Sequence, residues 1–185
     1  MTATLADLID THLTKVRTRL ERSNLVMLET GSIRSDQLRF RDGDGWSTVA
    51  LATNVKVHGG RSTSVDLDTS VASQVLSTNG LHDYVRLVDG HSIDKLGEYL
   101  LTGEKFDFIL LDSDNDAALI LHEWYLAKRL INPGGIIMID DVEPGSKEVL
   151  KGNDLIPHLN LHKIQYSLHK RSKNRITTGV AVVEF

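Results

Sequence analysis

Acidic residues follow five short apolar runs of the chain, and carboxylates in such places can bind a metal ion or the hydroxyls of a sugar. If these runs are neighbouring parallel strands, their carboxyl ends meet at one edge of a sheet, where ligands bind. Solubility does not require acids to gather at one edge, so we expect a cation or a polyhydroxyl ligand there. The polar residues after the five runs are Glu29 and Gly31; Asp66 and Asp68; Asp89, Gly90, His91 and Ser92; Asp112, Asp114, Asn115 and Asp116; and Asp140, Asp141 and Glu143.

Asp66 is the candidate for a ribose contact. It lies roughly twenty residues beyond a turn that contains glycine, where a carboxylate can accept hydrogen bonds from both hydroxyls of a ribose. The alternative role is to cap the helix that follows, but Asp68 can serve that purpose instead. We therefore expect Asp66 and the neighbouring Leu67 to face a nucleoside.

The glycine turn lies in the stretch LETGSIRSDQLRFRDGDGWST (28–48). The compact G-x-G-x-x-G pattern, which places a pyrophosphate on a helix N-terminus, is absent, and this disfavours nicotinamide and flavin cofactors. A helix that begins at GWST (45–48) offers hydroxyls and unpaired N–H groups to a small anion such as a carboxylate. The residues predicted to bind a cofactor here are Glu29, Gly31, Gly45, Trp46, Ser47 and Thr48.

A ligand that contains adenine, ribose and a carboxylate but no phosphate is S-adenosylmethionine. Each of its parts has a candidate contact in this chain. Residues 45–48 suit the methionine end, and Asp66 suits the ribose. The turn of His91 and Ser92, after Gly90, suits the edge of the adenine.

Short apolar runs alternate with segments of helical periodicity, which predicts a parallel sheet covered by helices on both faces. The predicted strands are 25–28, 63–66, 85–88, 106–112 and 136–140, and the predicted helices are 1–22, 46–55, 70–78, 92–101 and 117–130. Two strand-like segments in the tail, 162–168 and 179–185, have no helix between them and predict an antiparallel hairpin. The predicted fold class is therefore α/β: a doubly wound, mostly parallel, Rossmann-like sheet of seven strands that ends in an antiparallel hairpin.

The composition is that of a soluble globular protein. The chain has 185 residues, of which 41% are hydrophobic, with a net charge of −4 and no cysteine. These values predict a single domain over residues 1–185, exclude disulfide and thiolate chemistry, and give no general affinity for nucleic acid. No apolar run approaches the ~20 residues of a membrane span and no signal-peptide core is visible, so we expect a cytoplasmic protein.

Several motifs resemble those of class I S-adenosylmethionine-dependent methyltransferases, above all the small metal-dependent enzymes of the catechol O-methyltransferase type. LETG and GWST resemble the two halves of the first cofactor motif, VDLD the ribose-binding strand end, and VDGHS the segment that closes over adenine. FDFILLDSDND followed by INPGGIIMIDDV resembles the signature of the fourth and fifth strands. The resemblance implies methyl transfer from S-adenosylmethionine to an oxygen of a small hydroxylated molecule.

The resemblance also implies a divalent metal held by Asp112, Asp140 and Asp141. It implies in addition that Asp112 binds the cofactor, close to its sulfonium side. Three carboxylates that converge beyond adjacent strands repel one another unless a cation lies between them, which agrees with this assignment. An all-oxygen ligand set favours Mg²⁺, with Mn²⁺ and Ca²⁺ as the alternatives. Such a metal would bind two neighbouring substrate hydroxyls and lower the pKa of one of them. The alternative is that these acids are helix caps and surface charges.

One departure from the family concerns the general base. The catechol enzymes have a lysine three residues after the first metal aspartate, whereas this chain has Asn115, which cannot take a proton. Activation must then come from the metal, from another side chain such as His122, or from a substrate group that is already acidic. The catalytic candidates are accordingly Asp112, Asn115 and His122.

A second departure is the extended loop 32–45, which separates the two halves of the glycine motif. It contains Arg34, Arg39 and Arg41, which suit a carboxylate or a phosphate. Loops of this length inside a compact domain are often functional, so we predict a lid, with a plain surface insertion as the alternative. The chain leaves little room for a substrate domain, and a partner subunit in a homodimer could complete the pocket.

Two other functions stay open. One is a protein that binds S-adenosylmethionine without methyltransferase turnover, which the asparagine in the base position supports. The other is a different nucleotide-binding α/β enzyme, such as a dehydrogenase, against which the absent phosphate motif and the antiparallel tail argue.

Overall fold

Strands and helices alternate along most of the chain in the computed structural model, which describes residues 3–37, 46–173 and 176–185. The strands are β1 (Leu25–Thr30), β2 (Gly60–Asp66), β3 (Arg86–Asp89), β4 (Phe106–Leu111), β5 (Ile131–Ile139), β6 (Ser167–Lys173) and β7 (Ile176–Glu184). The helices are α1 (Leu5–Leu20), α3 (Ser47–His58), α4 (Ser70–Thr78), α5 (Ser92–Thr102), α6 (Ala117–Leu130) and α7 (Gly152–Leu161), with a short 3₁₀ helix η2 (His82–Tyr84).

The seven strands form one sheet in the order β3-β2-β1-β4-β5-β7-β6. Strands β1 to β5 pair in parallel, whereas β7 is antiparallel to both β5 and β6. The direction of strand addition reverses between β1 and β4, and ligands of open α/β sheets bind beyond the carboxyl ends of the strands at such a point. This topology confirms the predicted fold, including the C-terminal hairpin.

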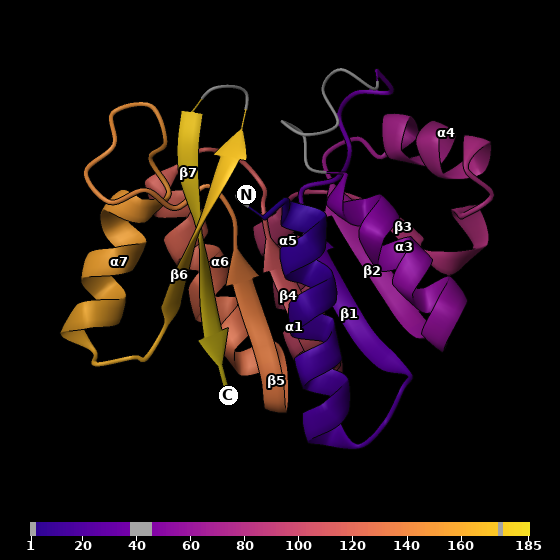
Figure 1. The fold of residues 1–185 in the computed structure, drawn as a ribbon, viewed down its shortest axis with the longest axis horizontal. Helices are drawn as coiled ribbons and strands as arrows, with labels where there is room; N and C mark the ends of the chain where they lie inside the picture. Colours follow the sequence, from indigo (N-terminus) through magenta and orange to yellow (C-terminus); the bar gives the residue numbers. More distant parts are fainter. Residues whose placement is uncertain (1–2, 38–45, 174–175) are drawn as a thin grey trace.

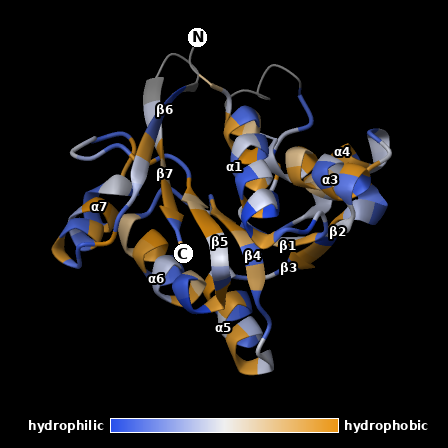
Figure 2. Ribbon diagram, turned by 60° about the horizontal axis from the view of Figure 1, so that its bottom comes forward, coloured by the Kyte–Doolittle hydropathy of each residue, from blue (hydrophilic) through white to orange (hydrophobic). Residues whose placement is uncertain are grey.

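Helices cover both faces of the sheet (Figure 1). Helices α1 and α3 pack on one face, where alternate strand residues such as Phe108 and Met138 form a buried cluster with them. Helices α5, α6 and α7 pack on the other face against the intervening residues, such as Ile109 and Ile139. Figure 2 shows largely hydrophobic central strands between helices of mixed hydropathy. No helix within the described ranges is long and apolar enough to cross a bilayer.

The region between β5 and β6 differs from the prediction. Helix α7 was not expected, and it contains Pro157, which removes a backbone donor from the helix interior. The predicted strand 162–168 is wrong in its first part, because the chain leaves α7 at Leu161 and β6 begins at Ser167. The apolar residues that suggested a strand there, Ile164 and Tyr166, instead pack against the core beside α6 and α7.

Strands β1 and β4 approach each other closely at the switch point. The N–H of Gly31 donates to Val65 and the N–H of Asp112 donates to Thr30, both at 2.8 Å. A Cβ atom on Gly31 would lie 2.1 Å from the carbonyl oxygen of Asp112, and the φ of Gly31 is +84°. Only glycine has no Cβ and adopts a positive φ without strain, so glycine at this position lets the two strand ends lie side by side.

Candidate functional site

Two adjoining cavities lie at the carboxyl edge of the sheet. The first, of about 300 Å³, has Gly31, Asp66, Leu67, Gly90, His91 and Ser92 in its wall. The second, of about 290 Å³, has Asp112, Asn115, Asp141, Val149, Lys151 and Thr178 in its wall. Arg34, Ser113 and Asp114 line both cavities. The two spaces therefore share a boundary just beyond β4.

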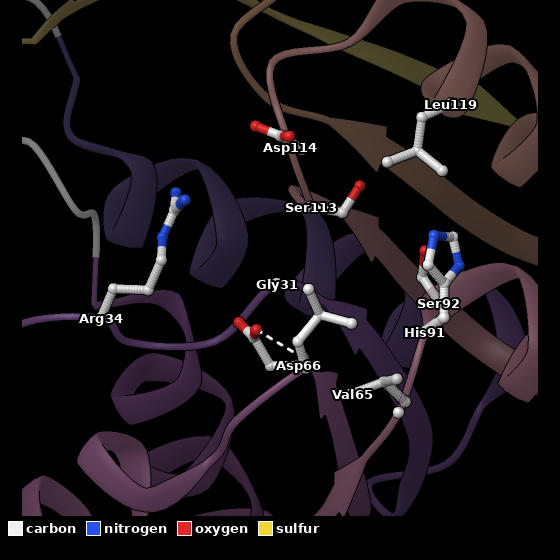
Figure 3. Close-up of a pocket in the computed structure, with 11 residues that line it drawn as sticks. Gly31, Arg34, Val65, Asp66, His91, Ser92, Ser113, Asp114 and Leu119 are labelled. Atoms are coloured by element: carbon white, nitrogen blue, oxygen red, sulfur yellow. Dashed lines mark hydrogen bonds between the residues drawn. The ribbon is translucent and has the colours of Figure 1, made fainter.

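Asp66 ends β2 and lies in the wall of the first cavity (Figure 3). Its Oδ2 accepts hydrogen bonds from the N–H and the hydroxyl of Ser32 (2.6 and 3.1 Å), and its Oδ1 accepts one from the N–H of Leu67 (2.7 Å). An ionised carboxylate has about four lone-pair positions, so a fourth donor such as a ribose hydroxyl can still bind. The first turn of α4 is served by Asp68, which accepts a hydrogen bond from the N–H of Ser70 (2.9 Å).

The turn after β3 forms another part of the same wall. His91 is the N-cap of α5, and its Nδ1 accepts a hydrogen bond from the N–H of Ile93 at 3.3 Å. In the neutral ring the proton is then assigned to Nε2, which can donate to a ligand. Figure 3 shows His91 and Ser92 on one side of the hollow and Arg34 on another.

Glu29, near the end of β1, is fully buried and lines neither cavity. Its Oε2 accepts hydrogen bonds from the hydroxyls of Thr48 (2.7 Å) and Ser64 (2.6 Å). These bonds connect the start of α3 and strand β2 to strand β1. Burial raises the pKa of Glu29 to about 7, against the opposing effect of hydrogen bonds from Ser47, Ser64 and Thr48.

Of the other residues predicted at the methionine end, the three that the structure describes, Trp46, Ser47 and Thr48, line neither of these two cavities. Trp46 is buried with Ile33 in a small apolar cluster against α4, so these two residues anchor the two ends of the loop 32–45. Ser47 and Thr48 are buried as well. Gly45 lies outside the described residues, as do Arg39 and Arg41. The binding roles of residues 45–48 stay a prediction.

The structure brings Asp112, Asp140 and Asp141 together beside the second cavity. One carboxylate oxygen of each lies within 4.8 Å of the others. Asp140 is fully buried, and burial together with the neighbouring Asp112 raises the pKa of Asp140. Asp141 has a left-handed φ of 56°, a conformation that aspartate adopts more readily than most residues.

Two buried side-chain cations lie among these acids. Arg171 of β6 donates from Nε to Oδ1 of Asp140 at 2.8 Å and from a terminal nitrogen to Oδ2, and it lies 3.5 Å from Asp141. Lys151, at the start of α7, donates from Nζ to Oδ1 of Asp112 at 2.9 Å. The side chains of Lys151 and Arg171 are each only 2% exposed. Burial lowers the pKa of Lys151, but the three carboxylates outweigh that effect and raise it, so the ammonium stays charged.

These contacts decide how well the cluster fits the divalent metal that the family resemblance implies. Both oxygens of Asp140 are bonded to a guanidinium, which cannot deprotonate to make room for an ion. One oxygen of Asp112 is bonded to the ammonium of Lys151. The three acids are close enough to share an ion. However, Arg171 and Lys151 already bind oxygens that an ion would need, so the residues present do not fit a divalent metal.

The sequence analysis did not identify Lys151 or Arg171. Lys151 belongs to a polar stretch, and Arg171 to the basic run HKRSKNR, and both contexts are typical of solvated surface. The available signal was indirect: three converging carboxylates require positive charge between them. That argument predicted positive charge among the acids, but the sequence analysis assigned it to a divalent metal.

The other two catalytic candidates have different surroundings. The side-chain amide of Asn115 donates to the carbonyl of Glu148 and accepts from the N–H of Leu150, both at 2.7 Å. Asn115 thus holds the segment that leads to Lys151. His122 is exposed on α6 and lines neither of the two cavities.

Glu123 of α6 is a further buried acid that the sequence analysis missed. Its Oε2 accepts a hydrogen bond from the hydroxyl of Thr30 at 3.2 Å. Burial raises the pKa of Glu123, while hydrogen bonds from Ser92 and Ser113, which line the first cavity, oppose that rise. A glutamate in an amphipathic helix usually indicates the solvent face, so the sequence pattern gives no signal for this residue.

The profile of a protein family described as a methyltransferase domain matches residues 43–142, more than half of the chain. This stretch includes β2 to β5 and the polar strand ends that line both cavities. The chain belongs to this methyltransferase family. A comparison with curated proteins gave no match.

The methyltransferase shares its fold with solved enzymes. An O-methyltransferase from Bacillus cereus in complex with S-adenosylhomocysteine is 19% identical, with 95% of this chain and 81% of that chain covered and a TM-score of 0.69. TomG, an O-methyltransferase from Streptomyces achromogenes solved with S-adenosylmethionine, is 18% identical over 95% and 79% of the two chains, with a TM-score of 0.67. MycE, a methyltransferase of the mycinamycin pathway solved with Mg and S-adenosylhomocysteine, is 14% identical. The comparison covers 100% of this chain and 54% of MycE, with a TM-score of 0.59.

At these identities the likeness shows the fold alone, a Rossmann-like methyltransferase fold. The family match and this fold confirm the resemblance to methyltransferases, and the metal dependence that it implied stays a prediction. The methyl acceptor and the roles of individual residues are matters for proposal.

Proposed function

We propose that this methyltransferase binds S-adenosylmethionine in the first cavity and transfers the methyl group to an oxygen of a small hydroxylated molecule in the second. The observation that carries the proposal is the pair of adjoining cavities, with Asp66 in one, Asp112 in the other and Ser113 shared between them. Structures with this fold were solved with S-adenosylmethionine or its demethylated product, which supports the choice of cofactor.

The cofactor contacts follow from the wall of the first cavity. Asp66 accepts hydrogen bonds from the ribose, for which it has lone-pair capacity left beside the bonds from Ser32 and Leu67. His91 and Ser92 meet the edge of the adenine. Gly31 lies in the same wall, where the absence of a side chain lets the ends of β1 and β4 lie close together beneath the cofactor.

The reaction is an in-line displacement between the two cavities. A lone pair of the acceptor oxygen attacks the methyl carbon, the carbon–sulfur bond breaks, and its electron pair stays on sulfur. The hydroxyl proton passes to water at the open side of the second cavity. Positioning supplies most of the rate in such a reaction, and the shared boundary at Ser113 and Asp114 places the two reactants next to each other.

The size of the second cavity supports a small acceptor. Its volume of about 290 Å³ lies at the lower end of the usual range for small-molecule sites, roughly 300–1,000 Å³. Metal assistance, which the sequence motifs imply, is not part of this proposal. MycE was solved with Mg, but in this chain Arg171 and Lys151 are bonded to the acids that would hold an ion.

Asn115 supports a second candidate, a protein that binds S-adenosylmethionine without turnover. Its side-chain amide cannot take a proton, and both the nitrogen and the oxygen of that amide are hydrogen-bonded to backbone groups. A thermal-shift panel with S-adenosylhomocysteine, NAD and ATP, followed by assays of S-adenosylhomocysteine release on simple phenols and diols, tests both functions. We expect the melting temperature to rise with S-adenosylhomocysteine and not with NAD or ATP. We also expect S-adenosylhomocysteine to be released from S-adenosylmethionine only when an acceptor is present. Binding without release over the panel would favour the second candidate, and a shift with NAD alone would contradict both.

A further inference from the structure

We propose that Lys151 and Arg171 take the place of a divalent ion in the acidic cluster, and that Lys151 donates a hydrogen bond to the acceptor oxygen. The second half rests on the proposed function, whereas the first half concerns the resting protein. The starting observation is that two side-chain cations, each 2% exposed, contact the three carboxylates that a metal would use.

The two side-chain cations give the cluster the same net charge that a divalent ion in their place would give it. With all groups ionised, three carboxylates and two side-chain cations leave one net negative charge. Three carboxylates with one divalent ion would leave the same charge. An ion added to the cations that are present would instead leave a buried net positive charge, which is strongly unfavourable away from water.

The geometry of Arg171 excludes an ion more firmly than charge alone does. Its planar guanidinium is bonded to both oxygens of Asp140, a bidentate pair that fixes both partners. The register of the C-terminal hairpin places Arg171 opposite Thr178, which lines the second cavity. An ion at Asp140 would have to break this pair and leave a guanidinium buried without its partner.

Lys151 is the cation that lines the second cavity. Its ammonium is hydrogen-bonded to Asp112, which lines the same cavity, and this bond uses one of its three donors. A remaining donor can bind the acceptor oxygen and hold it toward the first cavity. An ammonium binds one oxygen at a time, whereas a metal chelates two neighbouring hydroxyls. We therefore infer that acceptors with a single hydroxyl are used as well as vicinal diols.

Titration with Mn²⁺, followed by the electron paramagnetic resonance signal of the free ion, tests the first half directly on the full chain. With or without S-adenosylhomocysteine, we expect the wild type to bind Mn²⁺ more weakly than about 1 mM. One Mn²⁺ bound per chain below about 0.1 mM, and lost in Asp140→Asn, would overturn the proposal. This readout needs no turnover, so a protein without methyltransferase activity does not affect it.

Arg171→Met frees both oxygens of Asp140 and should make the acids available to an ion. We expect it to bind Mn²⁺ at least about tenfold more tightly than the wild type, with Lys170→Met unchanged, because Lys170 is exposed on the same strand. Lys151→Met provides the same comparison where Arg171→Met does not fold. No gain in a folded variant would contradict the claim that these side chains occupy the place of the ion.

Turnover with and without EDTA tests the second half. We expect EDTA to leave the wild-type rate unchanged, and Lys151→Met to raise the KM of the acceptor at least about tenfold with the same affinity for S-adenosylhomocysteine. Lys151→Arg should recover part of the loss, because it keeps a cation beside Asp112. Loss of activity in EDTA would contradict the first half as well, and equal acceptor KM values in wild type and Lys151→Met would overturn the second. The proposed methyl transfer still stands in either case.

Discussion

At the scale of single residues, Glu29 should make the stability of the fold depend on pH. Burial raises its pKa from 4.5 to about 7, so the folded chain holds this proton more tightly than the unfolded chain. The stability that results is complete below the unfolded pKa and is lost as the pH rises through about 7.

Glu29→Gln removes this titration while keeping an acceptor oxygen for Thr48 and Ser64. Relative to the variant, the wild type should lose about 3 kcal/mol of unfolding free energy between about pH 4 and pH 8. Urea denaturation of both proteins at the two pH values measures this difference. If the unfolding free energies of both proteins change equally with pH, Glu29 is not the source of the pH dependence.

Gly31 should be the glycine that tolerates substitution least among those at the site. Gly31→Ala is expected to cost more than about 3 kcal/mol, because its Cβ would meet a backbone carbonyl and its φ is positive. Gly97→Ala in the middle of α5 is the matched control, since a Cβ there meets nothing within 4 Å. That change should stabilise the chain by about 0.5–1 kcal/mol. Similar effects of both substitutions in urea denaturation would contradict the close approach of β1 and β4.

The convergence of the acids at the strand ends could be predicted from the sequence, because the apolar runs before them mark where each strand ends. Asp112, Asp140 and Asp141 directly follow apolar strands, so their convergence follows from a parallel sheet. Lys151 and Arg171 reach the same place from a loop and from an edge hairpin. Their positions depend on tertiary packing that no local pattern encodes, and this is why the sequence analysis missed both side chains and assigned the positive charge to a metal.

At the scale of elements, Asn115 connects the end of β4 to the segment before α7. Asn115→Ala removes both hydrogen bonds to that segment, so we expect the amide of Leu150 to exchange its hydrogen at least about tenfold faster. Asn132→Ala, which loses a side-chain bond to Asp107 at the opposite edge of the sheet, is the matched control. Exchange at Leu150 that is equal in both variants would mean that Asn115 does not hold this segment.

The elements themselves were predictable to different degrees. Strand β4 and the end of β5 (136–139) are almost wholly apolar and are buried on both faces, and this pattern has few alternatives in an α/β chain. Helix α7 has a proline at position 157, and β6 begins within a polar run at the sheet edge. Neither shows a clear period, so packing against α6 and pairing with β7 define them.

At the scale of the whole molecule, the extended loop 32–45 is attached at both of its described ends. Ser32 donates hydrogen bonds to Asp66, while Ile33 and Trp46 lie in the apolar cluster at α4. Arg34 lines both cavities, so the loop begins directly over the boundary between them. This arrangement supports the lid that the sequence predicts, and the lid stays a proposal.

The central claim is that the first cavity binds the cofactor through Asp66, and calorimetric titration with S-adenosylhomocysteine tests it most directly. We predict one binding site in the wild type, affinity about tenfold to a hundredfold weaker in Asp66→Ala, and wild-type affinity in Asp68→Ala, whose carboxylate serves only α4. No binding to the wild type, or equal affinities in the wild type and Asp66→Ala, would contradict the account.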